Sequence, residues 1–582
     1  MNPANPHHAA PALQATTPSL GVRLWVDAGQ VCLQVANEGG RGAPLLMLVL
    51  PVQRGADGRL AALQPLPALA ADATAWAGFL RLQARRLPAT LPMPATERFS
   101  GADWQRLSQG QPQVLVLVLF HRNDGGATAA GQRAAPVLDL QQHAAAIAQA
   151  VLAFFDAPPT PGWLRRGLVQ LAAADVPGAD PGPDAFTLAL ASCHYPAGLM
   201  DGTPADWSAT SGRLPGPADA AMLRLAQRLD TLAEPARPSL LLLTGDQIYA
   251  DATAGLFDPR SARLPARGSG APAADDWLRK PYQHWLASVG TQAVLGLLPS
   301  RMLMDDHEIA DNWAPLPAGA DAQARLQARR RRAAGREAFL RHQRNLPAGV
   351  LPGVLWQTVR HRGIGFFLAD TRTERSARTA SGDALRPRIL ARRQAHALQR
   401  WLALDVQQPA FVVSPSMLLP RRRASARSLA GALQSDAWCG FPGSLHGLLA
   451  QLWRLGRQNL VFLSGDEHLS CAVEATISDA ARSRSVRILS IHSSGLYAPY
   501  PFANSVPEDF MLPDAWQFAD PADPQQQFHC TVQPCGPWVP GDGFALISLV
   551  PPAAAGAAWQ LQLQFDRADA AGPVQVFPLP SG

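Results

Sequence analysis

The stretch LLLLTGDQIYAD, residues 240–251, joins a run of leucines to an abrupt polar turn. A short apolar run that stops at a glycine is typical of a buried strand that enters a loop. Several other segments repeat this pattern, so we predict several buried strands whose ends carry polar loops. They are Phe186–Ala191 before Ser192–Tyr195, Met302–Met304 before Asp305–Glu308, Gly365–Ala369 before Asp370–Arg372, Phe411–Val413 before Ser414–Ser416, and Leu460–Leu463 before Gly465–His468.

Amphipathic helical patterns lie between these runs, and their alternation with strands predicts an α/β fold. In open α/β sheets, ligands bind outside the carboxyl ends of the strands. Four of the strand ends carry an acid, a histidine or a cysteine, so we predict a metal site at that edge. The predicted helices are Ala218–Leu232, Arg388–Leu404, Ser444–Leu455 and the arginine-rich Ala322–Asn345, which we interpret as an exposed helix.

The first third of the chain has a different pattern. Residues 1–20 are predicted to be flexible, and Asp139–Phe155 has helical spacing. The Pro- and Gly-rich segment Ala173–Pro183 reads as a linker, so we predict a β-rich domain over residues 21–180 and a second domain over residues 181–582. The β-rich prediction rests on the runs Val22–Val26, Val31–Val35, Leu45–Val52 and Val114–Phe120.

Composition limits the classes of function. A chain of 582 residues that is 47% hydrophobic can bury a large core, and a charged fraction of 16% argues against disorder of the whole chain. The net charge of +6 permits an anionic partner without requiring one. No segment reaches the roughly 18 consecutive apolar residues of a membrane helix. The single lysine, Lys280, lies in neither a P-loop nor a Schiff-base motif.

The cysteines and the N-terminus bear on localisation. The six cysteines lack the spacing of a metal ribbon, and no export signal is readable at the N-terminus. We therefore predict a reduced, cytoplasmic protein. Cys530 and Cys535 are expected to pair only in an exported protein.

The polar turns contain plausible metal ligands. Asp246 follows a strand and a glycine, where a carboxylate can bridge two ions, and the phenol of Tyr249 suits a hard trivalent metal. Asp466 and His468 have the spacing that lets alternate side chains of an extended backbone reach one ion. Each residue alone is more often structural; their joint occurrence at successive strand ends favours a metal centre.

Taken in order, these motifs resemble the PhoD-like alkaline phosphatases of the calcineurin-like metallophosphoesterase superfamily. The resemblance covers roughly residues 186–504 and is specific as an ordered set, whereas Gly-Asp alone is not. The first 180 residues have no part in it. The matching segments are Ser192-Cys193, Gly245–Asp251, Asp305–Trp313, Asp370–Arg372, Ser464–Ser470 and Ser493–Pro499, with Arg393–Leu402 and Asp436–Trp438 also fitting the pattern.

The resemblance implies a metallophosphoesterase-type sandwich of two mixed β-sheets flanked by helices, with the smaller β-rich domain before it. It also implies a dinuclear metal site at the strand ends. Cys193, Asp246 and Tyr249 are expected to hold Fe³⁺, with Asp246 bridging to a second ion. Because its ligands are rich in oxygen, the second ion is expected to be Ca²⁺, or alternatively Mn²⁺ or Mg²⁺. The residues expected around this second ion are Asp306, Asp466 and His468.

The superfamily has a middle histidine for which this chain shows no clear counterpart. Ser414–Met417 is the nearest candidate segment. The completeness of the second site is therefore left open by the sequence.

The mechanism implied by the resemblance is in-line attack at phosphorus by a hydroxide that bridges the two metals. His307 is expected to hydrogen-bond or protonate the leaving oxygen, and Glu308 to orient His307. Arg372 is expected either to neutralise phosphoryl oxygens or to pair with an acid such as Asp370. His194 is expected either to contact substrate or to make a structural hydrogen bond.

The sequence thus predicts a metal-dependent hydrolase of small or polymeric phosphomonoesters or phosphodiesters. Residues 253–274 and 314–324 are expected to form loops that set substrate choice. The main alternative is a catalytically weak protein of the same fold that binds a phosphorylated ligand or partner. A third hypothesis, an arginine-rich nucleic-acid-binding protein, predicts strongly salt-dependent affinity for DNA or RNA.

Overall fold

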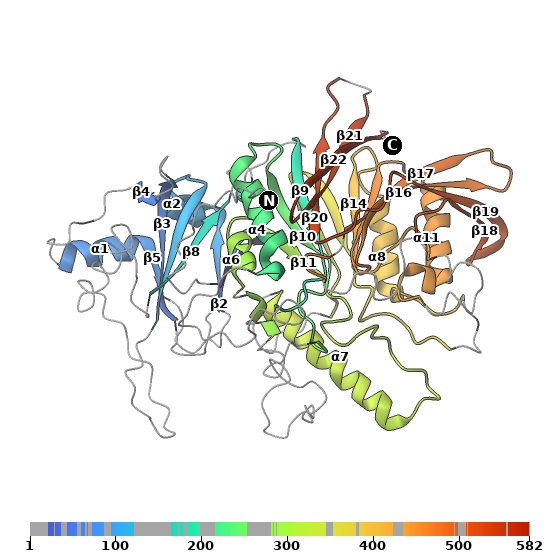
Figure 1. Ribbon diagram of the computed structural model, residues 1–582, viewed down its shortest axis with the longest axis horizontal. Helices are drawn as coiled ribbons and strands as arrows, with labels where there is room; N and C mark the ends of the chain where they lie inside the picture. The colour runs from blue at the N-terminus through green and yellow to red at the C-terminus, as the bar shows by residue number, and fades with distance from the viewer. Residues whose placement is uncertain are drawn as a thin grey trace, which may run out of the picture.

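The computed structural model describes residues 21–27, 29–36, 44–54, 60–63, 67, 73–86, 95–120, 164–171, 175–177, 184–197, 216–252, 281–282, 284–286, 288–344, 353–379, 383, 385–422, 435–493, 495–498, 508, 510–554 and 557–580 (Figure 1). Three of the sequence predictions lie outside these residues. They are the flexible segment 1–20, the helix Asp139–Phe155 and the loop at residues 253–274.

Two β-sheets form the larger part of the molecule (Figure 1). The six-stranded sheet has the order β11-β10-β9-β20-β21-β22, with β9 at Phe186–Ala191, β10 at Pro238–Leu243, β11 at Ser300–Met302, β20 at Gly543–Val550, β21 at Trp559–Arg567 and β22 at Ala571–Leu579. The eight-stranded sheet has the order β12-β13-β14-β15-β17-β16-β19-β18. Its strands are β12 Gln357–His361, β13 Ile364–Leu368, β14 Ala410–Ser414, β15 Leu460–Ser464, β16 Ser470–Asp479, β17 Ser485–Ser493, β18 Asp514–Asp520 and β19 Asp523–Pro534.

Both sheets mix parallel and antiparallel neighbours. β9, β10 and β11 run parallel while β20 runs antiparallel to β9. β13, β14, β15 and β17 run parallel while β12 and β16 run antiparallel to their neighbours. The predicted α/β fold with two mixed sheets is therefore confirmed.

The main core lies between the two sheets. Leu188 and Leu242 of the six-stranded sheet share one buried cluster with Phe366, Val413 and Leu463 of the eight-stranded sheet. All six residues of β9 and all six of β10 are buried, because helices cover the opposite face of the sheet as well. Burial on both faces explains why these strands read as continuous apolar runs and not as alternating patterns.

Helices cover the outer face of each sheet. The 3₁₀ turn η3 (Pro217–Asp219), α4 (Ala220–Thr231) and α6 (Val289–Leu295) lie with the six-stranded sheet. The turn η4 (Trp438–Gly440) and the helices α8 (Arg392–Leu402) and α11 (Pro442–Leu455) lie with the eight-stranded sheet (Figure 1). The predicted helices at these positions are thus present: α4 and α8 are slightly shorter than predicted, and α11 begins two residues earlier.

The N-terminal part contains two further sheets, and its predicted β-rich character is confirmed. One has the order β1-β2-β6, with β1 at Gly21–Asp27, β2 at Gln30–Ala36 and β6 at Ala95–Ser100. The other contains β3 (Pro44–Arg54), β4 (Leu60–Ala62), β5 (Ala84–Arg86), β7 (Gln113–Phe120) and β8 (Leu164–Gln170). Helices α1 (Ala73–Gln83) and α2 (Gly101–Ser108) accompany them. The boundary near residue 180 remains a prediction.

Helix α7 (Ala322–His342) corresponds to the predicted arginine-rich helix. Its first half is mainly exposed, whereas Ala334, Ala338 and Phe339 are buried near its end. The fully buried residues of α7 therefore all lie in its C-terminal half. Among the residues that the structure describes, no helix is long and apolar enough to cross a membrane.

Candidate metal centre

Two Gly-Asp turns bring the ends of β9, β10 and β15 together. A Cβ atom on Gly245 would lie 2.4 Å from the Cβ atom of Asp305, and one on Gly465 would lie 2.4 Å from the hydroxyls of Ser192 and Thr244. Gly245 also has a φ of +117°, which favours glycine. Glycine is therefore required at both turns, and these turns place the aspartates that follow them at one site.

Three of the predicted ligands have unusual backbone conformations. Cys193, Asp246 and Asp466 have φ values of 55°, 56° and 91°. A positive φ costs a non-glycine residue roughly 1–3 kcal/mol and persists only where the surrounding structure enforces it. The conformation is consistent with residues held in place for a functional purpose.

Four buried or half-buried carboxylates converge at this edge of the sheets. Asp246, Asp305, Asp306 and Asp466 each offer an oxygen, and these oxygens lie within 4.8 Å of one another. We call these four residues the carboxylate cluster. Asp246, Asp306 and Asp466 were predicted as ligands, and the structure brings them together with Asp305, to which no role was assigned.

The carboxylates of the cluster repel one another. Burial and the neighbouring Asp306 raise the pKa of Asp246 well above its usual value, and burial with Asp305 and Asp306 does the same for Asp466. Burial raises the pKa of Asp305 to about 7 although Arg372 opposes it. A cation would remove this electrostatic cost.

The cluster also contains a buried oxygen without a partner. Among the described residues, Oδ2 of Asp305 forms no hydrogen bond. An unpaired buried carboxylate oxygen is costly unless a ligand or ion satisfies it. Three observations fit a hard metal cation: the oxygen-rich set of donors, the repulsion between the carboxylates and the unpaired oxygen of Asp305.

Cys193 and Tyr249 lie near Asp246 of the cluster. The sulfur of Cys193 lies 3.4 Å from Oδ2 of Asp246. Tyr249 is buried, and burial together with the nearby Cys193 and Asp246 raises the pKa of its phenol well above the usual value. The three residues predicted for the iron site are therefore neighbours.

His468 lies close to the cluster but outside the set of four carboxylates. Its ring meets the ring of Tyr195 edge-on, with centroids 5.6 Å apart. Tyr195 in turn stacks on Tyr249 at 3.7 Å. His468 thus lies next to the aromatic pair at the site, and its role as a ligand remains a prediction.

His307 is held by Asp251. Its Nδ1 lies 2.7 Å from Oδ1 of Asp251, and its ring lies 4.1 Å from the ring of Tyr249. Its Nε2 lies 4.0 Å from Asp306 and 3.8 Å from Asp311. Although burial lowers it, the carboxylates of Asp306 and Asp251 raise the pKa of His307 to about 9.

Glu308 does not have the partner predicted for it. Its carboxylate accepts hydrogen bonds from the backbone N–H groups of Asp246, Gln247 and Asp305, at 3.1, 2.9 and 2.8 Å, and from the side chain of Gln343 at 3.0 Å. Asp251, not Glu308, is hydrogen-bonded to Nδ1 of His307. Side chains of adjacent residues at this turn point in different directions, which the sequence alone did not reveal.

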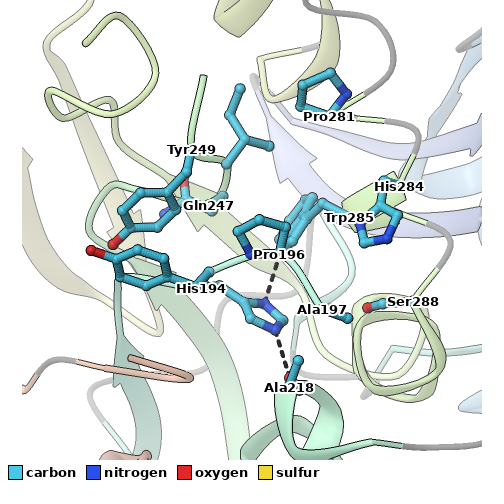
Figure 2. A pocket seen from close by; sticks show the side chains of 12 residues that line it. His194, Pro196, Ala197, Ala218, Gln247, Tyr249, Pro281, His284, Trp285 and Ser288 are labelled. Atoms are coloured by element: carbon cyan, nitrogen blue, oxygen red, sulfur yellow. Dashed lines mark hydrogen bonds between the residues drawn. The ribbon is translucent and has the colours of Figure 1, made fainter. Parts of the chain in front are cut away.

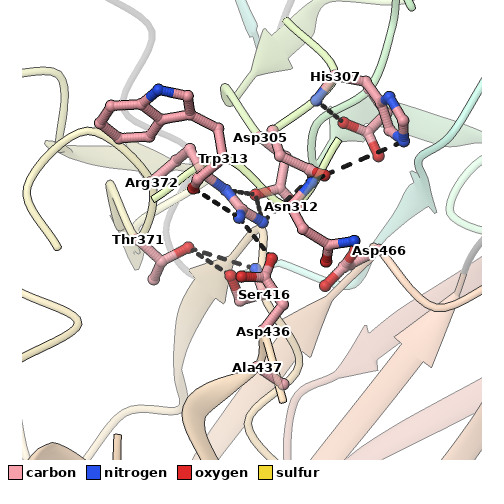
Figure 3. A network of polar contacts seen from close by, with 12 residues as sticks. Asp305, His307, Asn312, Trp313, Thr371, Arg372, Ser416, Asp436, Ala437 and Asp466 are labelled. Atoms are coloured by element: carbon pink, nitrogen blue, oxygen red, sulfur yellow. Dashed lines mark hydrogen bonds and ion pairs between the residues drawn. The ribbon is translucent and has the colours of Figure 1, made fainter. Parts of the chain in front are cut away.

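Arg372 is fully buried in a network of acids (Figure 3). Its Nε donates to Asp305 at 2.7 Å, and its Nη2 forms ion pairs with Asp305 at 2.6 Å and Asp306 at 3.2 Å. Its Nη1 bonds to Asp436 and to the carbonyl of Trp313. The guanidinium therefore faces carboxylates on several sides, although Asp370 is not among those that it pairs with.

His194 makes two structural hydrogen bonds. Its Nε2 lies 2.7 Å from the carbonyl of Ala218, and its Nδ1 accepts a hydrogen bond of 3.0 Å from Trp285 (Figure 2). Both ring nitrogens are thus engaged, which matches the structural alternative and disfavours direct contact with substrate.

His194 lines a pocket behind Tyr249, with an empty volume of about 370 Å³ that includes space open to solvent (Figure 2). Gln247 also lines this pocket, and neither polar atom of its buried side chain has a hydrogen-bond partner among the described residues. The pocket therefore adjoins the metal centre but contains none of the four clustered carboxylates.

Ser414–Met417, the candidate segment for the superfamily's middle histidine, contains no histidine, cysteine or carboxylate. Ser416 follows β14, and its hydroxyl contacts Thr371 at 3.0 Å and Arg375 at 3.2 Å. Ser414–Met417 therefore supports the Arg375 side of the ion-pair network.

Sequence reasoning missed the roles of Asp251, Asp305 and Asp436. All three lie inside the quoted motifs, so position in a motif was the available signal. Their partners come from distant segments: Asp436 pairs with Arg372 and Arg375, residues separated from it by about sixty positions. Only the fold brings these residues together.

Comparison with known proteins confirms the predicted resemblance. A family model described as PhoD-like phosphatase matches residues 225–508. A solved structure of PhoD aligns over 96% of this chain and 90% of its own, with 12% sequence identity and a TM-score of 0.53. Purple acid phosphatase PPD1 from yellow lupin (Lupinus luteus) seeds aligns over 97% of this chain and 74% of its own, with 10% identity and a TM-score of 0.43. No curated protein matches the chain.

Proposed function

We propose that this chain, whose residues 225–508 are of the PhoD-like phosphatase family, hydrolyses phosphoesters with a dinuclear metal centre. The family match supports a metal-dependent phosphatase. The observation that carries the proposal for this chain is the cluster of four carboxylates whose oxygens lie within 4.8 Å of one another at the strand ends.

The residues would divide between two ions. Cys193, Asp246 and Tyr249 would hold Fe³⁺, and Asp246 would also reach the second ion. Asp306, Asp466 and His468 would hold Ca²⁺, or alternatively Mn²⁺ or Mg²⁺, because hard cations prefer oxygen ligands. Bound metals would supply Lewis acidity at the phosphoryl group and an acidified water as nucleophile.

His307 is proposed as the group that gives a proton to the leaving oxygen. Asp251 occupies Nδ1, so Nε2 is the nitrogen that faces the carboxylates of the site. A positioned acid of this kind typically contributes about 10²–10⁴-fold. Asp251 fixes the orientation of the ring in this proposal, which replaces the role first given to Glu308.

Arg372 is proposed to neutralise and fix Asp305 and Asp306. Its buried guanidinium already contacts these carboxylates and Asp436. This geometry favours support of the metal ligands over a direct contact with phosphoryl oxygens.

The decisive experiment combines metal analysis with turnover. Purified protein is expected to contain two metal ions per chain and to be coloured by a phenolate or thiolate bound to iron. Asp246→Asn should lose hydrolysis of aryl phosphate mono- and diesters in iron, calcium, manganese or magnesium while remaining folded. The exposed Asp523→Asn serves as the matched control.

The outcomes separate the hypotheses. Full activity of a folded, metal-free Asp246→Asn protein would refute the proposal. Retained metal without hydrolysis of any ester would favour the alternative, a binding protein for a phosphorylated ligand or partner. Relative rates on the two ester types decide between monoesterase and diesterase activity. A colourless, iron-free protein would remove Cys193 and Tyr249 from an iron site.

We also propose a cytoplasmic location, because all six cysteines are free thiols and such thiols are usual in reducing compartments. Fractionation of native cells with an antibody to the chain would test this, and recovery outside the cytoplasm would refute it.

A further inference from the structure

The N-terminal sheet β1-β2-β6 contacts the catalytic part of the chain at the edge strand β11 and at the end of helix α7. Arg23 of β1 is buried, and its Nε donates to the hydroxyl of Ser300 on β11 at 2.8 Å. Its Nη1 donates to the backbone carbonyl of Gln343, the residue that follows α7. Gln34 of β2 donates to the carbonyl of His342 at 3.2 Å. Two side chains of the N-terminal sheet therefore fix the last turn of α7.

The end of α7 is in turn bonded to Glu308. The side-chain amide of Gln343 donates to Oε1 of Glu308 at 3.0 Å, and both residues are fully buried. Helix α7 also packs directly on this turn, since a Cβ atom on Gly335 would lie 2.5 Å from the carbonyl oxygen of Glu308. The orientation of Glu308 is thus coupled to the position of α7.

Glu308 joins the two turns that carry the metal ligands. One carboxylate oxygen accepts from the N–H groups of Asp246 and Asp305, and the other accepts from Gln247. Asp246 follows β10, and Asp305 follows β11. A shift of Glu308 would therefore move ligands from both strands at once.

We propose that Arg23 and Gln34 are positioning residues for the metal centre, acting through Gln343 and Glu308. The N-terminal sheet then has a function in the catalytic machinery, although it contributes no residue to the site itself. This inference rests on the proposed function for the identity of the bound ions, but the hydrogen-bond chain on which it depends is independent of them.

The first test measures backbone amide exchange in the full-length, metal-free protein. Arg23→Met should speed exchange of the amides of Asp246, Gln247 and Asp305 by about 10-fold, because a loosened Glu308 releases these donors. Arg301→Met is the matched control. Arg301 bridges the same interface to the carbonyl of Val26 and to Asp27, but not to Gln343. Arg301→Met should therefore leave the exchange rates of the amides of Asp246, Gln247 and Asp305 unchanged.

The second test measures metal affinity by titration with iron, calcium or manganese. Gln343→Leu should weaken binding by about 10–100-fold, as expected for a partner of groups that hold ligands. Arg23→Met, one step further away, should weaken binding by about 3–10-fold, and Arg23→Lys should recover part of the loss because lysine still donates to a carbonyl. If these residues only stabilised the fold, the substitutions would lower the melting temperature, but the loss of metal affinity would not decrease in the order Gln343→Leu, Arg23→Met, Arg23→Lys.

Equal effects of Arg23→Met and Arg301→Met on exchange and on metal affinity would overturn the inference. If Arg23→Met does not fold, Gln34→Leu takes its place with the same two measurements, and unchanged amides in a folded Gln34→Leu protein would also overturn it. Amide exchange requires neither metal nor substrate. A protein that shows the predicted exchange but hydrolyses no ester would therefore refute the proposed function while supporting this inference.

Discussion

A cluster of four carboxylates and a single carboxylate flanked by two arginines lie side by side in this molecule, and their pKa values are shifted in opposite directions. In the carboxylate cluster, burial and like charges raise the pKa values of Asp246 and Asp466. In the adjoining network, which includes Arg372 and Asp436 (Figure 3), burial also acts on Asp436. Arg372 and Arg375 nevertheless lower the pKa of Asp436 below the usual range. We call Arg372, Arg375 and Asp436 the arginine network.

The difference shows where a cation is needed. The arginine network has its own cations, so its acid is stable as a carboxylate. Arg372 reaches into the carboxylate cluster, where it forms ion pairs with Asp305 and Asp306. Identical residue types thus act as structural ions in one group and as candidate metal ligands in the other.

The largest effect is expected from Asp436→Asn. Removing this charge leaves the buried guanidinium of Arg375 without its carboxylate partner and takes one of three carboxylate partners from Arg372. Breaking such a buried pair typically costs about 3–5 kcal/mol. Urea denaturation should show a loss of stability of that size, with or without metal. A loss below 1 kcal/mol, about the value of a surface ion pair, would contradict the comparison.

Asp466→Asn should change the stability of the metal-free protein in the direction opposite to that of Asp436→Asn. In the metal-free protein it relieves repulsion within the cluster, so the free energy of unfolding should rise. With metal present, turnover should fall by more than about 100-fold, beyond the usual effect of a residue that only supports a ligand. Asparagine also tolerates the positive φ at this position. Lower stability of the metal-free variant would show that the cluster is not under repulsive strain.

Asp251→Asn tests whether Asp251 orients His307 or binds a metal ion. It should lower kcat by about 10–100-fold because His307 loses the carboxylate beside Nδ1, by analogy with other partners that orient a functional histidine. Metal content should stay unchanged, since Asp251 is outside the cluster of four. Metal loss in this variant would place Asp251 among the ligands.

The smallest effect concerns His361, a half-buried histidine that stays neutral in the folded protein near neutral pH. Burial lowers the pKa of His361 from 6.5 to about 4, although Asp175 opposes the shift. The unfolded chain then binds a proton below pH 6.5 while the folded protein does not, so stability should fall as the pH drops from 6.5 towards 4. His361 should contribute a slope of at most about 1.4 kcal/mol per pH unit. A folded His361→Gln protein should lose that contribution, while the similar contributions of His446 and His492, whose pKa values burial also lowers to about 4, remain. An unchanged slope would assign the pH dependence to other groups.

Much of the architecture could be predicted from local patterns. The apolar runs from Phe186 to Leu463 all lie in strands or reach their ends, because burial on both faces leaves a continuous apolar signal. The candidate ligands Asp246, Asp306 and Asp466 could be found because each lies two to four residues after the end of a strand. The Gly-Asp turns belong to the same local signal, since close approach of the strand ends excludes a side chain at Gly245 and Gly465.

The pairing of side chains could not be predicted in the same way. Glu308 follows His307 directly, yet it bonds to backbone groups of its own turn and of the turn after β10. Asp251 reaches the His307 ring from 56 positions away. Arg372 similarly meets Asp305 and Asp436 from distant segments. Side-chain direction at an irregular turn depends on φ and ψ values that the neighbouring strands impose, and these are set by the whole fold.

The sequence by itself determined the fold class, the order of the strands along the chain and the identity of most candidate ligands, because these depend on local polarity and spacing. Only the tertiary structure decided which acids gain a cation and which lack one. It also linked the N-terminal sheet to the metal centre through Arg23, Gln343 and Glu308, whose contacts span up to 320 positions. Charge balance inside a protein is a property of neighbours in space, and distant parts of the chain supply those neighbours.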